Sequence, residues 1–119
     1  LVSDVLLTGT NAITRDGKLY NVDGKGNRVA AMIYGPRQVI VVAGINKVVK
    51  DLAQAEERVK QHAAPINCLR VNAPNPCTKT GYCLDCDSPR RICNAAVTLH
   101  KQPYGNQITV LLIGEELGF

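Results

Sequence analysis

The sequence QVIVVAGINK, residues 38–47, gives the clearest indication of the architecture. Apart from Gln38, its first six residues are apolar and mostly β-branched, which is typical of a parallel strand covered on both faces. Gly44 would end this strand, and Asn46 could cap the helix expected next. Apolar residues then recur at the spacing of one helix face at Val48, Leu52, Ala55 and Val59. We therefore expect a buried strand followed by a helix that ends near His62.

A strand, a hairpin and a short helix are expected on the N-terminal side. Residues 4–8 form an apolar run that ends at Gly9, which indicates a buried strand. The Asp16-Gly17 dipeptide lies between two apolar pieces and predicts a hairpin turn. Asn27 could cap a helix over residues 28–34.

Two further strands are expected on the C-terminal side. They cover residues 96–100 and 108–113, and residues 103–106 would form the turn of an antiparallel hairpin. Because strands and helices alternate along the chain, the predicted fold class is α/β. The length of 119 residues suits one small domain, residues 1–119.

Composition excludes several classes of protein. With 14 basic and 10 acidic residues, the net charge of +4 suits an anionic small molecule better than a nucleic acid. The chain has no Trp and one Phe, so it lacks the aromatic side chains on which single-stranded bases stack. No apolar run reaches the roughly 20 residues of a membrane-spanning helix, and no signal peptide pattern is present. We expect a cytoplasmic protein without a membrane span, and a homo-oligomer is left open.

Residues 74–93 form a long loop rich in cysteine and proline. Cys83 and Cys86 have the Cys-x2-Cys spacing, which lets two thiolates from one turn reach the same ion, and two flanking cysteines could complete a tetrahedral site. Zinc and an iron–sulfur cluster are both open, since a cluster also takes four thiolates. Two disulfides or free thiols are the alternatives, and Cys68 is expected to be a buried core residue. The predicted metal ligands are Cys77, Cys83, Cys86 and Cys93.

Glycines and amides near the first strand and the first helix suggest a ligand site. Open α/β sheets bind ligands where strands end, and backbone N–H groups at a helix N-terminus favour an anion. The alternative is turn and capping chemistry alone. The predicted ligand-binding residues are Gly9, Asn11, Gly24, Gly26, Asn27 and Arg28.

Arg28 is the charged member of this predicted site. Its guanidinium could hold a carboxylate or a phosphate in a bidentate fork. Replacing Arg28 with Met is then expected to abolish binding and to leave the stability of the unliganded protein nearly unchanged. After the next strand, Lys47 could supply a second anion contact, although helix capping by Asn46 is the default interpretation there.

Four segments have a recognisable pattern: TGTNAIT at 8–14, DGKL at 16–19, DGKGNRVA at 23–30 and VVAGINKVV at 41–49. Together they resemble the LUD domain of lactate utilization proteins. The cysteine-bearing subgroup of that family is similar to PCTKTG at 76–81, SPRRICN at 88–94 and EELGF at 115–119. The likeness spans essentially the whole chain and corresponds to the C-terminal part of a longer domain. We therefore interpret the start at Leu1, without Met, as the start of a fragment.

The resemblance implies a Rossmann-like sheet of the NagB/RpiA/CoA-transferase type, with ligands at strand C-termini. It also implies a role in oxidising lactate to pyruvate beside iron–sulfur redox partner proteins. This chain would then be an accessory component with a metal or iron–sulfur site in its cysteine loop. The alternatives are an enzyme or sensor that binds an anionic metabolite or nucleotide, with a purely structural cysteine loop, and an interaction module. No catalytic residue carries over, so enzymatic activity is left open.

Overall fold

The computed structural model describes residues 5–70, 75, 77–80, 92–103 and 107–118. Its strands are β1 (Val5–Thr8), β2 (Ala12–Thr14), β3 (Leu19–Asp23), β4 (Gln38–Gly44), β5 (Val48–Val49), β6 (Ala95–Leu99) and β7 (Gln107–Ile113). Its helical elements are α1 (Asn27–Tyr34), η1 (Ile45–Lys47), α2 (Leu52–Arg58), η2 (Val59–Ala63), α3 (Ala64–Arg70) and α4 (Cys77–Thr80). The α/β class is confirmed, and the Rossmann-like subtype stays a prediction.

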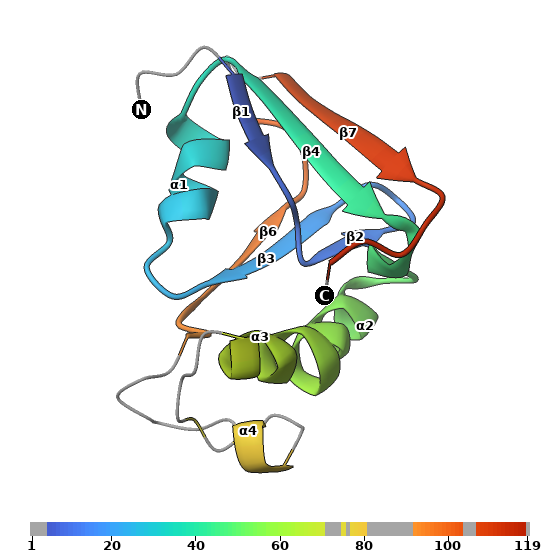
Figure 1. Cartoon of the computed structure of the whole chain (residues 1–119). Helices are drawn as coiled ribbons and strands as arrows, with labels where there is room; N and C mark the ends of the chain where they lie inside the picture. Colours follow the sequence, from blue (N-terminus) through green and yellow to red (C-terminus); the bar gives the residue numbers. More distant parts are fainter. Residues whose placement is uncertain (1–4, 71–74, 76, 81–91, 104–106, 119) are drawn as a thin grey trace.

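The strands form two sheets that pack face to face (Figure 1). One sheet is parallel and has the order β1-β4-β7, and the other is mixed and has the order β5-β2-β3-β6. Helix α1 closes one side of the space between them, and α2 packs on the far face of the mixed sheet. This gives layers of parallel sheet, mixed sheet and helix.

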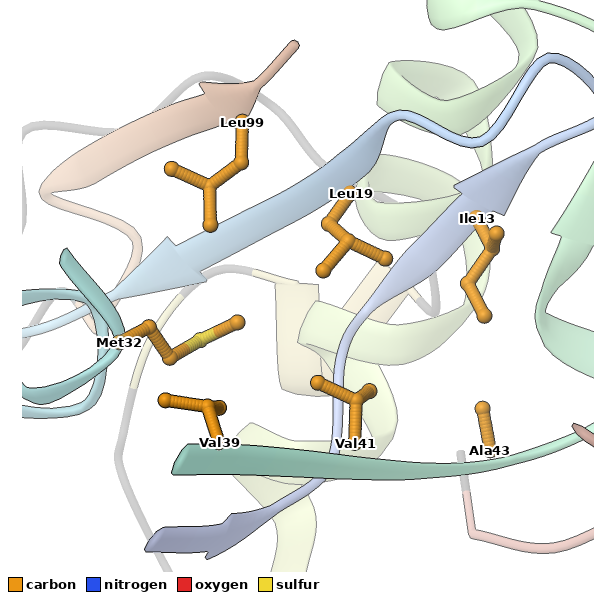
Figure 2. Close-up of a cluster of buried hydrophobic side chains, with 7 residues drawn as sticks. All are labelled: Ile13, Leu19, Met32, Val39, Val41, Ala43 and Leu99. Atoms are coloured by element: carbon orange, nitrogen blue, oxygen red, sulfur yellow. The ribbon is translucent and has the colours of Figure 1, made fainter. Parts of the chain in front are cut away.

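The main core lies between the two sheets (Figure 2). Val39, Val41 and Ala43 project from β4 toward Ile13, Leu19 and Leu99 of the mixed sheet, and Met32 of α1 fills the side. Val39, Val41 and Met32 are fully buried. The alternation of β4 therefore directs every second residue into the core.

The prediction that β4 is the central strand of a parallel sheet is confirmed, because β1 and β7 both pair with it in parallel. Burial on both faces holds only in part. The face with Val39 and Val41 is buried, whereas Ile40 and Val42 on the other face are half-buried. On the neighbouring β1, Leu7 is in register with Ile40 and is 70% exposed.

The predicted C-terminal hairpin is wrong. Strand β6 pairs antiparallel with β3 from Leu19↔Leu99 to Asp23↔Ala95, and β7 pairs in parallel with β4. A turn pattern is a local signal, whereas pairing depends on where the apolar side chains of a strand can be buried. In the structure Leu99 and Ile108 reach the same core from different sheets.

The helix expected after Gly44 begins and ends later than predicted. Asn46 lies in the short turn η1, and Val48 belongs to β5, which pairs in parallel with β2. Asp51 caps α2 by accepting a hydrogen bond from the Gln54 amide at 2.9 Å. Helical backbone continues through η2 to Arg70, past Pro65, because a π-helical segment changes the hydrogen-bond pattern just before the proline.

The predicted capping role of Asn27 is also wrong. The N-cap residue of α1 is Gly26, whose φ of +80° favours glycine and which has no side chain to accept a hydrogen bond. The Asp23 carboxylate instead accepts the Val29 amide at 2.9 Å. No helix in the described part of the chain is long and apolar enough to cross a membrane.

Candidate functional site

A pocket of about 330 Å³ opens where β3, α1, η1 and α3 meet. Its polar lining comes from five elements or the loops beside them, and its apolar lining comes mainly from η2 and α3. The lining residues are Asn11, Val22, Asp23, Gly24, Arg28, Lys47, Val59, Ala63, Ala64, Asn67, Arg70, Ile92 and Cys93.

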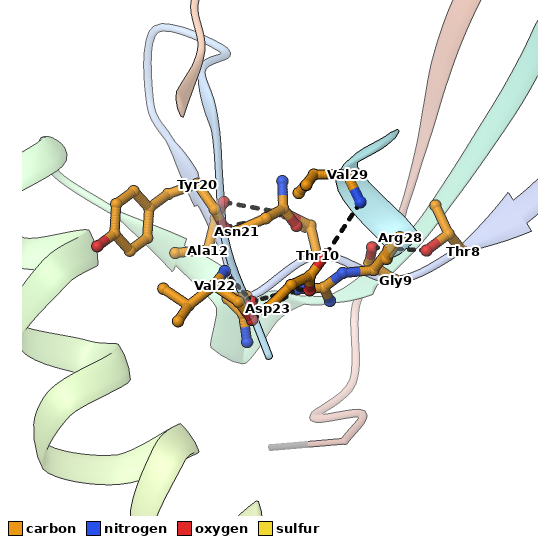
Figure 3. Close-up of polar contacts among 11 residues, drawn as sticks. Thr8, Gly9, Thr10, Ala12, Tyr20, Asn21, Val22, Asp23, Arg28 and Val29 are labelled. Carbon is orange, nitrogen blue, oxygen red and sulfur yellow. Dashed lines mark hydrogen bonds and ion pairs between the residues drawn. The ribbon is translucent and has the colours of Figure 1, made fainter. Parts of the chain in front are cut away.

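An ion pair between Arg28 and Asp23 forms one wall of the pocket (Figure 3). The Arg28 Nη2 lies 2.7 Å from the Asp23 Oδ1 and donates to the Asn11 Oδ1 at 2.6 Å. Asn11 Oδ1 also accepts the Val22 amide at 2.9 Å. Asp23 is buried and Arg28 is about a quarter exposed. Through these contacts Arg28 of α1 joins the end of β3 to the loop that carries Asn11.

Arg58 joins two loops behind the pocket. Its Nε donates to the main-chain carbonyl of Asn46 at 3.0 Å, and its Nη1 donates to that of Asn11 at 2.9 Å. Burial lowers the pKa of the Arg58 guanidinium from its ordinary value. The two hydrogen bonds hold this guanidinium beside the pocket, where its charge acts on Lys47.

Lys47 is the most perturbed cation of the pocket. Burial, together with the nearby positive charges of Arg58 and Arg28, lowers the pKa of Lys47 to about 8. Its ammonium makes no hydrogen bond or ion pair with any residue that the structure describes. A half-buried cation of this kind favours an anion from outside the chain, since an anion would offset its desolvation.

The pocket brings together half of the predicted ligand-binding residues. Asn11, Gly24 and Arg28 line it. Gly26 caps α1 and Asn27 is exposed, and neither lines the pocket. Gly9 is exposed near the backbone of β4, also outside the lining.

Sequence reasoning did not single out Asp23, Arg58, Asn67 and Arg70 as site residues. Asp23 stood in a glycine-rich segment that reads as a loop, and Arg58 lies 47 positions from the Asn11 carbonyl it binds. Asn67 accepts the Arg70 Nε at 2.9 Å on a helical turn that the predicted helix did not reach. The spacing of Asn67 and Arg70, three residues apart on a helix, was the one local signal available.

The cysteine prediction falls partly on residues outside the described structure. Cys83 and Cys86 lie outside it, whereas Cys68, Cys77 and Cys93 are described and are not in a disulfide. Cys77 is buried in α4 and packs with Cys68 and Ile92. Cys93 lines the pocket. Among the residues that the structure describes, no three His, Cys, Asp or Glu side chains gather into a group that could hold a metal.

Cys68 is buried, as expected, and it packs against Cys77 of the cysteine segment, which the sequence did not predict. The Asn75 amide Nδ2 donates to its sulfur at 3.4 Å. Ile92 packs against the cluster of Cys68 and Cys77, so residues from both ends of the cysteine segment lie beside Cys68 of α3. His62 and His100 are exposed.

A family model described as the LUD domain matches residues 1–113 of this chain. No curated protein and no solved structure gives a significant match.

Proposed function

Because the chain belongs to the LUD domain family, a family of proteins related to lactate utilization, we propose that it binds a small anionic metabolite in the pocket beside Lys47. The ligand class is a small molecule with a carboxylate or phosphate group. The observation that carries the proposal is Lys47, a half-buried ammonium without a partner among the described residues.

The charges around the pocket support an anion. Arg28, Lys47 and Arg70 line it, Arg58 lies behind it, and Asp23 is the acidic residue among its described lining. Asp23 is already paired with Arg28. Among the described residues, the charges of Lys47 and Arg70 are therefore left for a ligand. Lys47 is half-buried, so its charge attracts an anion more strongly than a surface charge does, whereas Arg70 is exposed and also donates to Asn67.

We place this binding in lactate oxidation to pyruvate, with the chain as an accessory component beside iron–sulfur partner proteins. Lactate and pyruvate are both monocarboxylates of a size that a pocket of about 330 Å³ accommodates. Cys93 in the lining is the point where this pocket adjoins the cysteine segment.

Replacing Lys47 with Met is expected to weaken anion binding by about 10-fold or more, because a hydrogen bond to a charged group is worth roughly 1.5–3 kcal/mol. The measurement is calorimetry with lactate, pyruvate and inorganic phosphate on the full chain. Lys50→Met is the matched control, since Lys50 is exposed and outside the pocket lining. Equal dissociation constants for the wild type and the Lys47 variant would remove Lys47 from the site.

The same site gives a pH dependence with a fixed sign. Lys47 is charged below its pKa of about 8, so anion affinity is expected to fall as pH rises through 8. In the unliganded protein the unfolded chain holds the Lys47 proton up to about 10.5, so stability should rise with pH between 8 and 10.5. Both trends should be absent in Lys47→Met.

A second proposed site is a metal or iron–sulfur centre held by Cys77, Cys83, Cys86 and Cys93. The observation that favours it is the small cluster of Cys68 and Cys77 against which Ile92 packs, because Cys77 and Ile92 come from opposite ends of the cysteine segment. Buried Cys77 and half-buried Cys93 are not in a disulfide. Such a centre would order the segment, since metal binding and local folding share one free energy.

Cys77→Ser is expected to lose most of the bound metal from anaerobically purified protein, measured by elemental analysis and by absorption near 400 nm for a cluster. Cys68→Ser, which alters a neighbouring buried thiol outside the proposed set, should retain it. Colourless protein with one bound zinc would select zinc over a cluster. Wild-type protein without metal would exclude the centre.

A further inference from the structure

The segment after β7 runs back over the turn that carries Lys47 (Figure 1). We call residues 114–118 the C-terminal strap. The Ile45 amide donates to the Glu115 carbonyl at 3.0 Å. Asn46 Oδ1 accepts the Leu117 amide at 3.0 Å, and Asn46 Nδ2 donates to the carbonyls of Leu117 and Gly118, each at 3.4 Å. The Asn46 side chain thus binds three backbone groups of the strap, which lie 71 or 72 positions later in the sequence.

Two glycines let the strap come close to this turn. A Cβ at Gly44 would lie 2.4 Å from the Leu117 nitrogen and 2.5 Å from the Glu115 oxygen, so only glycine leaves room for the strap. Gly118 has φ of +67°, and a Cβ there would lie 3.7 Å from the Lys47 Nζ. The end of the strap therefore lies against the ammonium of Lys47.

We propose that the C-terminal strap, which lies outside the pocket lining, orders the Lys47 side chain for anion binding, and that Asn46 is the positioning residue that holds the strap against Lys47. The inference rests on the proposed function of the pocket. A lysine side chain is flexible, and binding is stronger when the side chain is ordered before the ligand arrives. The strap limits the freedom of Lys47 and shields its ammonium from water.

The strap acts on Lys47 by covering it. In the part of the chain that the structure describes, the acidic residues of the strap form no ion pair with the Lys47 ammonium. Glu115 and Glu116 are both exposed. The charged groups around Lys47 from the other elements are Asp23 of β3, Arg28 of α1, Arg58 of α2 and Arg70 of α3. Three of these four groups are cations. Burial contributes most to the lowered pKa of Lys47, so removal of the strap should raise this pKa by exposing the ammonium to water.

The test follows the pKa of Lys47 by NMR on the full chain after reductive ¹³C-methylation, with the signal assigned through Lys47→Arg. In the wild type it is expected to titrate near pH 8. In Asn46→Ala, and in a chain lacking residues 115–119, it should move toward the ordinary 10.5, while the dissociation constant for inorganic phosphate rises about fivefold or more. Glu116→Gln, which alters an exposed strap side chain, should leave both values unchanged.

An unchanged Lys47 titration in both Asn46→Ala and the shortened chain would overturn the strap proposal, even if phosphate binds to the wild type. A second outcome is that the Lys47 titration shifts in the variants while the wild type binds none of the anions. This outcome would overturn the proposed function of the pocket and leave the contact between the strap and Lys47 in place. The shortened chain keeps the test decisive if Asn46→Ala fails to fold.

Discussion

Replacing Val41 with Lys is expected to lower the free energy of unfolding by about 4 kcal/mol or more, which is close to the whole stability of a small domain. Val41 is fully buried at the centre of the core, between Val39 and Ala43 on β4 and opposite the mixed sheet. A lysine there would bury an ammonium with no partner, or expose the core to let it reach water. Urea denaturation followed by circular dichroism measures the change.

Leu7→Lys is the matched control for this variant. Leu7 lies on the strand next to β4 and is 70% exposed, so a lysine there should change stability by no more than about 0.5 kcal/mol. If Val41→Lys unfolded at the same urea midpoint as the wild type, the assignment of Val41 to a buried core between the two sheets would be wrong. Equal losses in both variants would mean that the outer face of the parallel sheet is also covered in solution.

Replacing Arg28 with Met is expected to cost about 2–4 kcal/mol of stability in the absence of any ligand. The variant would leave the buried Asp23 carboxylate without its cation, and breaking such a pair by removing one partner is strongly destabilising. This outcome differs from the expectation drawn from the sequence, in which Arg28 only served a ligand. Chemical denaturation of the unliganded chain at pH 7 measures it.

Two further variants separate the ion pair from a general effect of losing a charge. Adding Asp23→Asn to Arg28→Met should restore part of the stability, because an amide still accepts the Val29 hydrogen bond and no buried charge is left unpaired. Lys18→Met breaks the exposed Lys18–Asp16 pair and should cost no more than about 1 kcal/mol. Equal losses for Arg28→Met and Lys18→Met would show that Arg28 has no structural role.

Three of the six predicted ligand-binding residues line the pocket, and they are three of its thirteen lining residues. Asn11, Gly24 and Arg28 were found because polar residues after a strand and before a helix form a local pattern. Asp23 and Arg58 act through partners that the chain brings near only when it folds, such as the Asn11 carbonyl bound by Arg58. The sequence does not decide the role of Lys47. In the structure this residue lies in η1, in place of the expected helix start, and lines the pocket.

The sequence by itself determined the α/β class, the position of β4 as a parallel central strand, the first hairpin and the family. These depend on short-range features: a run of β-branched residues, an Asp-Gly turn and contiguous motifs. Only the tertiary structure decided that β6 and β7 join different sheets, that Arg28 pairs with Asp23, and that the strap lies beside Lys47. The sheets and the strap depend on partners far away in the sequence, which no local pattern identifies. Asp23 and Arg28 are close in the sequence, and their pairing depends on how the loop between β3 and α1 folds and on which polar groups it buries.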